Sequence, residues 1–327
     1  MSKNRWILPD GVEEVLPSEA WRLEGLRRQL LDQMHEAGYQ LVIPPLVEFS
    51  DSLLTGLGED LDLQTFKMVD QISGKTLGLR SDISPQVARI DAHSLGGQGA
   101  RRLCYAGSTL KTLPNRVDGS RAPIQVGAEL FGEADESADL EIMSLMLACL
   151  QQAGVKNLTL EVSHVGITTQ LIAALAQAGC DTARLQEILE AKSMPDLAQW
   201  LDANPCPGDL SDMVRALPLL AGGEDLLERG EKVLADLPMV AGVISQLRRV
   251  VTALKLDWPD LNLFIDLGAL RGSHYHSGLV FAAFAPDMGS SIANGGRYDD
   301  VGAAFGVARP ATGFSADIRQ LIRAIPS

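Results

Sequence analysis

A long helical block between two strand-rich regions limits the fold of this chain more than any other sequence feature. Residues 167–255 show helical patterns only. Outside that block, strands are predicted in hairpin-like pairs, at 103–107 with 122–132 and at 276–284 with 290–294. Paired strands without regular β-α-β alternation favour an antiparallel sheet with packed helices over a doubly wound parallel sheet. We therefore expect an α+β fold, in which helices flank an antiparallel sheet and a helical insertion interrupts it.

Apolar residues at helical spacing locate the main helices. They predict a helix over 18–37, capped by Ser18 and followed by a strand over 39–43. Further helices are predicted over 137–153 and 315–324. The change in pattern also predicts two structural units, a sheet domain and a helical insertion subdomain. Their predicted bounds are 1–166 together with 256–327 for the sheet domain, and 167–255 for the insertion.

Charge and cysteine content exclude several classes of protein. The chain has 327 residues, 42 of them acidic and 28 basic, with a net charge of −14. This balance argues against general affinity for nucleic acid, because such binding depends on phosphate neutralisation. The four cysteines are widely spaced, so neither a zinc site nor a disulfide framework is predicted. Residues 1–10 lack a signal-peptide core, and no apolar run reaches the roughly 18–20 residues that span a bilayer. We expect a cytoplasmic protein with no membrane partner.

Common nucleotide-binding, zinc-protease and hydrolase motifs are absent. The sequence contains no GxxxxGKS/T, GxGxxG, HExxH or GxSxG. His274 and His276 fall on one predicted strand face, but two ligands without a third nearby are a weak metal signal. They are better explained as polar pocket lining. The glycine-rich turn 295–299 is interpreted first as structural, with pocket lining as the second possibility. We expect no metal and no cofactor.

Six segments nevertheless form a recognisable ordered set. They are LPDGVEEVLP (8–17), GYQLVIPPLVEF (38–49), LGLRSDISPQVAR (77–89), YAGSTLK…IQVGAELFG (105–132), ALRGSHYHSGLVFAAF (269–284) and ANGGRYDDV…ATGFSADIRQL (293–321). In this order the set resembles the histidyl-tRNA synthetases, which are class II synthetases. The first two segments resemble the motif that forms the dimer in that family. The resemblance implies a class II synthetase-like fold and self-association as a dimer.

The nucleotide half of the resembling site departs from the family pattern. Lys111 and Leu113 stand where the second motif carries an arginine for the ATP α-phosphate and an acid. Gln320 stands at the arginine of the third motif, and Asp317 replaces a usual glycine. Adenylate formation depends on cationic clamps around phosphate, and neither lysine nor glutamine reproduces the planar arginine fork. The departures imply lost synthetase chemistry and no catalytic residue. With no anticodon-binding domain in the chain, we also expect no tRNA partner.

The amino-acid half keeps the polar side chains that this family uses for histidine. Gln125 and Glu129 are four residues apart and therefore share one strand face. Acids for an ammonium and a cation for a carboxylate suit a zwitterionic amino acid. By the resemblance, Glu129 accepts a charge-assisted bond from the ligand ammonium, and Arg271 matches the catalytic arginine of the family. The implied histidine pocket comprises Asp82, Ser84, Gln125, Glu129, Arg271, Tyr275 and His276.

A chain that keeps the amino-acid half of the site and has lost the nucleotide half resembles the regulatory subunits of ATP phosphoribosyltransferase. The resemblance implies a non-catalytic chain that joins a short-form catalytic subunit in the first step of histidine biosynthesis. Such a chain contributes to activation and to histidine feedback, through two quaternary states that ligands bias differently. Two alternatives stay open: an active adenylating enzyme related to aminoacyl-tRNA synthetases, and an amino-acid-sensing module for another partner.

Overall fold

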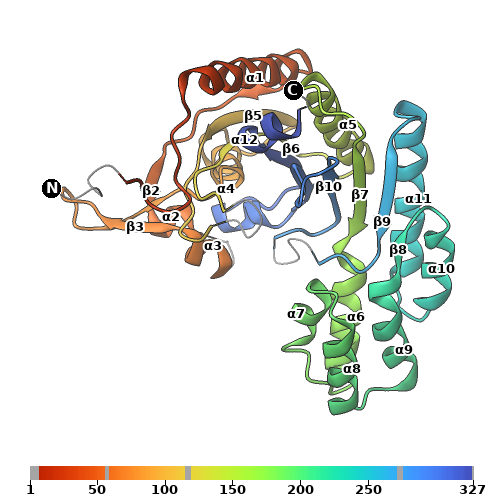
Figure 1. Ribbon diagram of the computed structural model, residues 1–327. Coiled ribbons are helices and arrows are strands. Elements are labelled where there is room, and N and C mark those ends of the chain that lie inside the picture. The colour runs from red at the N-terminus through yellow and green to blue at the C-terminus, as the bar shows by residue number, and fades with distance from the viewer. Residues whose placement is uncertain (1–6, 56–58, 115–118, 271–274, 326–327) are drawn as a thin grey trace.

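A nine-stranded sheet organises the molecule (Figure 1). The computed structural model describes residues 7–55, 59–114, 119–270 and 275–325. Neighbouring strands are antiparallel except for β1 with β5 and β7 with β9, which are parallel. The predicted α+β fold with a mainly antiparallel sheet is confirmed. In spatial order the strands are β1 (Gln40–Leu41), β5 (Arg101–Ser108), β6 (Ile124–Phe131), β12 (Ala311–Asp317), β11 (Ala293–Arg297), β10 (Leu279–Phe284), β7 (Thr159–His164), β9 (Asn262–Asp266) and β8 (Ala221–Gly222).

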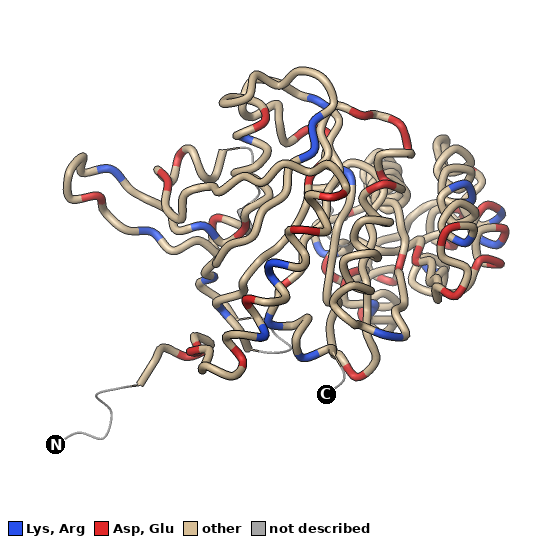
Figure 2. The backbone as a smooth tube through the Cα atoms, turned by 90° about the horizontal axis from the view of Figure 1, so that it is seen from above, with Lys and Arg blue, Asp and Glu red and all other residues tan. Residues whose placement is uncertain are grey.

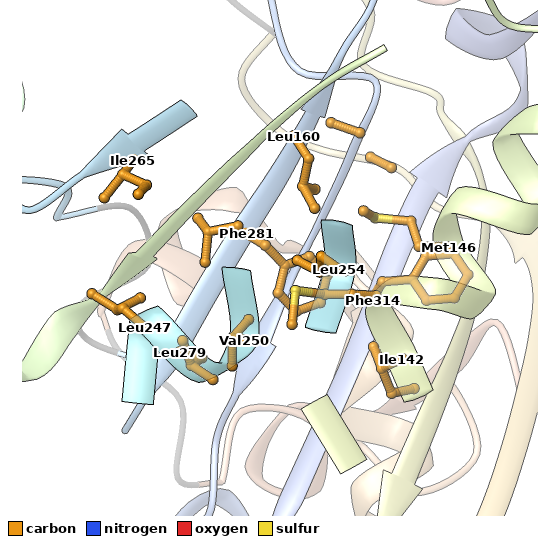
Figure 3. Packing of buried hydrophobic residues seen from close by; sticks show 14 of the residues in the cluster. Ile142, Met146, Leu160, Leu247, Val250, Leu254, Ile265, Leu279, Phe281 and Phe314 are labelled. Carbon is orange, nitrogen blue, oxygen red and sulfur yellow. The ribbon is translucent and has the colours of Figure 1, made fainter. Parts of the chain in front are cut away.

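Four helices pack against the sheet and form the main core with it. They are α1 (Pro17–Glu36), α5 (Glu136–Gln152), α11 (Val240–Asp257) and α12 (Ile318–Ala324). In Figure 3 the labelled side chains of α5 and α11 meet those of β7, β9, β10 and β12 in this core. Val126, Ala128 and Leu130 of β6 belong to it. Because side chains alternate along a strand, the residues between them face the opposite side of the sheet.

The opposite side of the sheet carries a smaller cluster, which supports the candidate site. Helix α4 (Ser84–Arg89), continued by a π-helical turn over Ile90–Ser94, packs here against the 3-10 turn Val301–Phe305. The cluster includes Tyr105 of β5 and Tyr298, which directly follows β11. Two short helices and a three-stranded antiparallel sheet in the order β2-β4-β3 flank this region. Their bounds are α2 (Ser50–Leu53), α3 (Glu59–Gln64), β2 (Val47–Phe49), β3 (Phe66–Val69) and β4 (Thr76–Leu79).

The predicted helical block contains six helices and one short strand that the periodicity did not predict. The helices below the sheet in Figure 1 are α6 (Val165–Gln177), α7 (Leu185–Glu190), α8 (Met194–Ala203) and α9 (Gly208–Ala216), followed by α10 (Leu226–Val233) and α11. Strand β8 has only two residues, which is too short to show an alternating pattern. Lys192 joins this block to the end of β9 through a 2.5 Å ion pair with Asp266. The division of the chain into two units stays a prediction.

Four local predictions are wrong in detail. Ser18 lies inside α1, which begins at Pro17 with Leu16 as an N-cap that makes no side-chain bond. The strand predicted over 39–43 is reduced to β1, because two prolines follow it. The helix predicted over 315–324 begins at Ile318, because the three preceding residues complete β12. The strand predicted at 290–294 is likewise shifted to β11.

Candidate functional site

The carboxyl group of Glu129 is buried among three hydroxyl groups. Glu129 lies in β6 and is 1% exposed. Its Oε1 accepts hydrogen bonds from Ser84 at 2.6 Å and Tyr105 at 3.2 Å, and its Oε2 accepts one from Tyr298 at 2.5 Å. Burial raises the pKa of Glu129 to about 7, and the three hydroxyl donors oppose that shift. Near neutral pH this carboxyl is therefore poised between its charged and neutral forms.

A glycine in the next strand makes room for this carboxyl group. Gly313 of β12 is paired with Glu129 in the sheet register. A Cβ atom at residue 313 would collide with Oε2 of Glu129. Only glycine therefore permits the buried orientation of Glu129.

Hydrogen bonds hold the segment before α4 against β6. Gln125 donates from Nε2 to Oδ1 of Asp82 at 2.7 Å, and its Oε1 accepts the backbone N–H of Ile83 at 2.9 Å. The N–H of Ser84 donates to the same Asp82 oxygen at 3.2 Å. These contacts bring four predicted residues into one site: Asp82, Ser84, Gln125 and Glu129.

A cavity of about 180 Å³ opens beside Glu129. Five residues of the implied histidine pocket line it, namely Asp82, Ser84, Glu129, Tyr275 and His276. Gln125 lines the neighbouring cavity instead. Arg271 lies outside the described residues, so its predicted role stays a prediction.

Tyr275 presents an unused hydroxyl group at this cavity. Its ring lies 5.1 Å from that of Tyr298 and 5.4 Å from that of His276, measured between centroids. The Tyr275 hydroxyl is buried and has no hydrogen-bond partner among the described residues. Burial and the nearby acids raise the pKa of Tyr275 well above its usual value, so it stays a donor. A buried donor without a partner costs free energy that a bound ligand can recover.

A second cavity of about 250 Å³ adjoins the first, because Asp82, Asn294 and Ser315 line both. Lys111 and Gln320, two of the predicted nucleotide-side departures, line it together. Lys111 is the one basic side chain that the described lining contains. Leu113, another of the departures, lines neither cavity and is 61% exposed.

Asp317 has a structural role in addition to lining the second cavity. Its Oδ1 accepts the backbone N–H groups of Ile124 at 3.1 Å and Arg319 at 3.0 Å. The second contact caps α12. Asp317 therefore adds negative charge to the cavity and also fixes the end of β12.

Sequence reasoning did not include Tyr105 and Tyr298 in the site. Tyr298 belongs to the glycine-rich turn 295–299. This turn was interpreted first as structural, so the Tyr298 hydroxyl was not assigned to the site. Tyr105 lies on β5, where Leu103 pairs with Glu129. Side chains alternate along a strand, so the predicted strands 103–107 and 122–132 could have placed Tyr105 on the same sheet face as Glu129. The sequence does not give the relative register of these two strands, which that inference needs.

The model of the histidyl-tRNA synthetase family matches residues 11–321. An ATP phosphoribosyltransferase regulatory subunit from Pseudomonas paraeruginosa is 51% identical over 98% of this chain and 81% of its own length. The chain belongs to the family of ATP phosphoribosyltransferase regulatory subunits. This membership agrees with the match to the histidyl-tRNA synthetase family model.

Solved structures agree with membership of the regulatory-subunit family. An ATP phosphoribosyltransferase regulatory subunit/histidyl-tRNA synthetase from Bacillus halodurans superposes with a TM-score of 0.88 at 25% identity, covering 100% of this chain and 85% of that one. A chain of an ATP phosphoribosyl transferase complex from Thermotoga maritima shares the fold, with a TM-score of 0.67 at 16% identity. That match covers 90% of this chain and 96% of the Thermotoga chain.

None of the described helices combines the length and apolar character that crossing a membrane requires. Within the same residues, His, Cys, Asp and Glu side chains form no group of three that suits a metal ion. His274, one of the two histidines weighed for metal binding, lies outside the described residues.

Proposed function

We propose that this chain is a non-catalytic regulatory subunit that joins a short-form ATP phosphoribosyltransferase catalytic subunit in the cytoplasm. The complex catalyses the first step of histidine biosynthesis. Relatives at about 50% identity carry the name of this regulatory subunit. The Thermotoga chain with the same fold is part of an ATP phosphoribosyl transferase complex.

The contrast between the two adjoining cavities is the observation that carries the non-catalytic part of the proposal. The cavity beside Glu129, which we propose as the amino-acid cavity, has a connected polar network. The nucleotide-side cavity offers Lys111 as its basic group within the described lining, opposed by Asp82 and Asp317. A triphosphate needs several converging cations. This cavity therefore supports the loss of adenylate chemistry.

Charge placement supports the expected absence of a tRNA partner. Figure 2 shows acidic and basic residues interspersed along the described chain, and the whole sequence has a net charge of −14. Binding to a polyanion depends on clustered basic side chains that release counterions. We therefore propose that this chain binds protein and amino-acid partners and no tRNA.

Histidine is the ligand that we propose for the amino-acid cavity. Asp82 Oδ1 accepts two hydrogen bonds, whereas the described residues make none to its Oδ2, which is available for an ammonium group. The resemblance placed Glu129 at the ammonium, but in this cavity it lies among aromatic rings and suits an imidazole, as does the Tyr275 hydroxyl, which has no partner among the described residues. Arg271 is proposed for the carboxylate by the family resemblance. Bound histidine then biases the quaternary state of the complex and contributes to feedback.

We also propose that the chain forms a homodimer through the edge of the large sheet. The apolar face of α1 is buried within the chain itself, including Leu26 and Leu30, so it is not free for a partner. Strand β1 is an edge strand, and Leu41, Ile43 and Leu46 nearby are 51%, 83% and 47% exposed. Exposed apolar residues at an unpaired edge are typical of an interface between copies.

The test is reconstitution with a short-form catalytic subunit. Phosphoribosyl transfer from phosphoribosyl pyrophosphate to ATP is measured with and without this chain, and histidine-dependent ATP–pyrophosphate exchange is measured on the chain alone. We expect co-elution of the two subunits, increased transferase activity and no exchange. Exchange above background would support the adenylating alternative. Failure to bind or activate the catalytic subunit would leave the sensing module for another partner as the better explanation.

A further inference from the structure

Two cysteines face each other in the helical block, away from both cavities. Cys180 follows α6, and Cys206 lies between α8 and α9. Their thiols make a side-chain hydrogen bond to each other. Both side chains are half-buried at the margin of the main core, and the residues on either side of each cysteine are exposed. A small reagent in solution can therefore reach this pair.

Contacts beside each cysteine hold the two loops together. The indole N–H of Trp200 in α8 donates to the carbonyl oxygen of Asp181 at 3.0 Å, next to Cys180. The side-chain amide of Asn204, close to Cys206, donates to the carbonyl oxygen of Trp200 at 2.9 Å. Trp200 is itself buried in the core. These contacts hold the two loops, and with them the two cysteines, beside each other.

We propose that Cys180 and Cys206 form an oxidation site, at which a peroxide converts the two thiols into an intrachain disulfide. One Sγ–Sγ bond forms while two S–H bonds break. The two sulfur atoms together lose two electrons. The O–O bond of hydrogen peroxide breaks and takes up these electrons with both thiol protons, giving two molecules of water.

The oxidation proceeds in two steps. The thiolate of one cysteine attacks the peroxide to give a sulfenic acid and hydroxide. The thiol of the other cysteine then displaces that hydroxyl group as water. The closed bond encloses α7 and α8 in a covalent ring, together with Lys192, which binds Asp266 of the sheet.

Cys104 and Cys149 provide an internal comparison. Cys104 lies in β5 and Cys149 in α5, and they are 1% and 3% exposed. Burial raises the pKa of Cys104 to about 11 and that of Cys149 to about 12. These two thiols are shielded from peroxide as well as protonated, so they should stay reduced.

Mass spectrometry of the whole chain tests the proposal. The chain is treated with hydrogen peroxide, alkylated in denaturant and digested with trypsin. We expect two of its four cysteines to become protected from alkylation, with one linked species joining the peptides 157–184 and 193–215. Dithiothreitol should restore all four thiols. Cys180→Ser and Cys206→Ser should each abolish the linked species, and either variant leaves the buried pair intact as an internal standard.

Three outcomes would overturn the proposal. The first is four alkylated thiols after peroxide treatment, and the second is separate over-oxidation of Cys180 and Cys206 without a linked peptide. The third is a bond that joins two chains, which non-reducing electrophoresis detects. None of these measurements depends on the proposed regulatory function.

Discussion

The hydroxyl of Tyr298 donates a 2.5 Å hydrogen bond to Oε2 of Glu129, so the residue after β11 contacts β6 across the intervening strand β12. This contact is possible because Gly313 of β12 has no side chain between them. Strand β6 therefore carries the buried carboxyl group, β12 leaves room for it, and the residue after β11 donates a hydrogen bond to it.

Glu129 should make the free energy of unfolding depend on pH. Its folded-state pKa of about 7 lies above the ordinary 4.5, so its proton stabilises the folded protein. This contribution is complete below about pH 4.5 and is lost as the pH rises through about 7. Relative to Glu129→Gln, the wild type should lose about 3 kcal/mol over that window. Urea unfolding at several pH values measures the difference. The exposed control Glu228→Gln keeps Glu129 and should therefore follow the wild-type curve over this window. Parallel curves for wild type and Glu129→Gln would contradict the prediction.

Removing the acids of the amino-acid cavity should weaken histidine binding. Asp82→Asn and Glu129→Ala should each raise the Kd for histidine about 30- to 150-fold, as expected for ~2–3 kcal/mol from a hydrogen bond to a charged group. Calorimetry of the isolated chain measures the Kd. Inhibition curves of the reconstituted transferase should shift in parallel, with uninhibited activity largely intact. Lys111→Met in the adjoining cavity is the matched control and should leave the Kd within about threefold. An unchanged Kd in both acid variants would exclude this cavity as the histidine site.

Gly313→Ala should damage both stability and ligand binding. The new Cβ collides with the Glu129 carboxyl, and β12 cannot shift because it is paired with strands on both sides. Overpacking of this kind costs about 1–3 kcal/mol. Gly25→Ala in α1 is the matched control, because nothing lies within 4 Å of its added Cβ. That control should be neutral or stabilising by up to ~1 kcal/mol. Thermal unfolding that ranks the two variants in the opposite order would refute this account.

The edge of the large sheet should control self-association. Ile43→Asp places a charge among the exposed apolar residues near β1 and should shift the chain towards monomer in sedimentation at micromolar concentration. Leu256→Asp changes a residue that is 78% exposed at the far end of α11, and this control should not alter the sedimentation coefficient. If Ile43→Asp sediments like the wild type, the interface lies elsewhere.

Local periodicity predicted α1, α5 and the main strand pairs because each of these elements repeats an apolar residue at its own spacing. It failed for β12, because this strand places Gly313 against Glu129 and glycine is uncommon in strands, so its presence argues against a strand. It also failed for β8, which has two residues and depends on pairing with β9. Tyr298 was excluded for a related reason, because its contribution arises only when β6, β12 and β11 are aligned. Pairwise register across the sheet is a long-range property that no single segment encodes.

The two backbone contacts of Asp317 tie the lining of the second cavity to the stability of the fold. Asp317→Gly would remove the cap of α12 and leave the N–H of Ile124 without its acceptor, at a cost of about 1–2 kcal/mol. Gln320→Arg would not recover that loss. Engineering this cavity to hold a nucleotide would therefore begin with a less stable protein, and the redesign would need a second, stabilising change elsewhere in the chain.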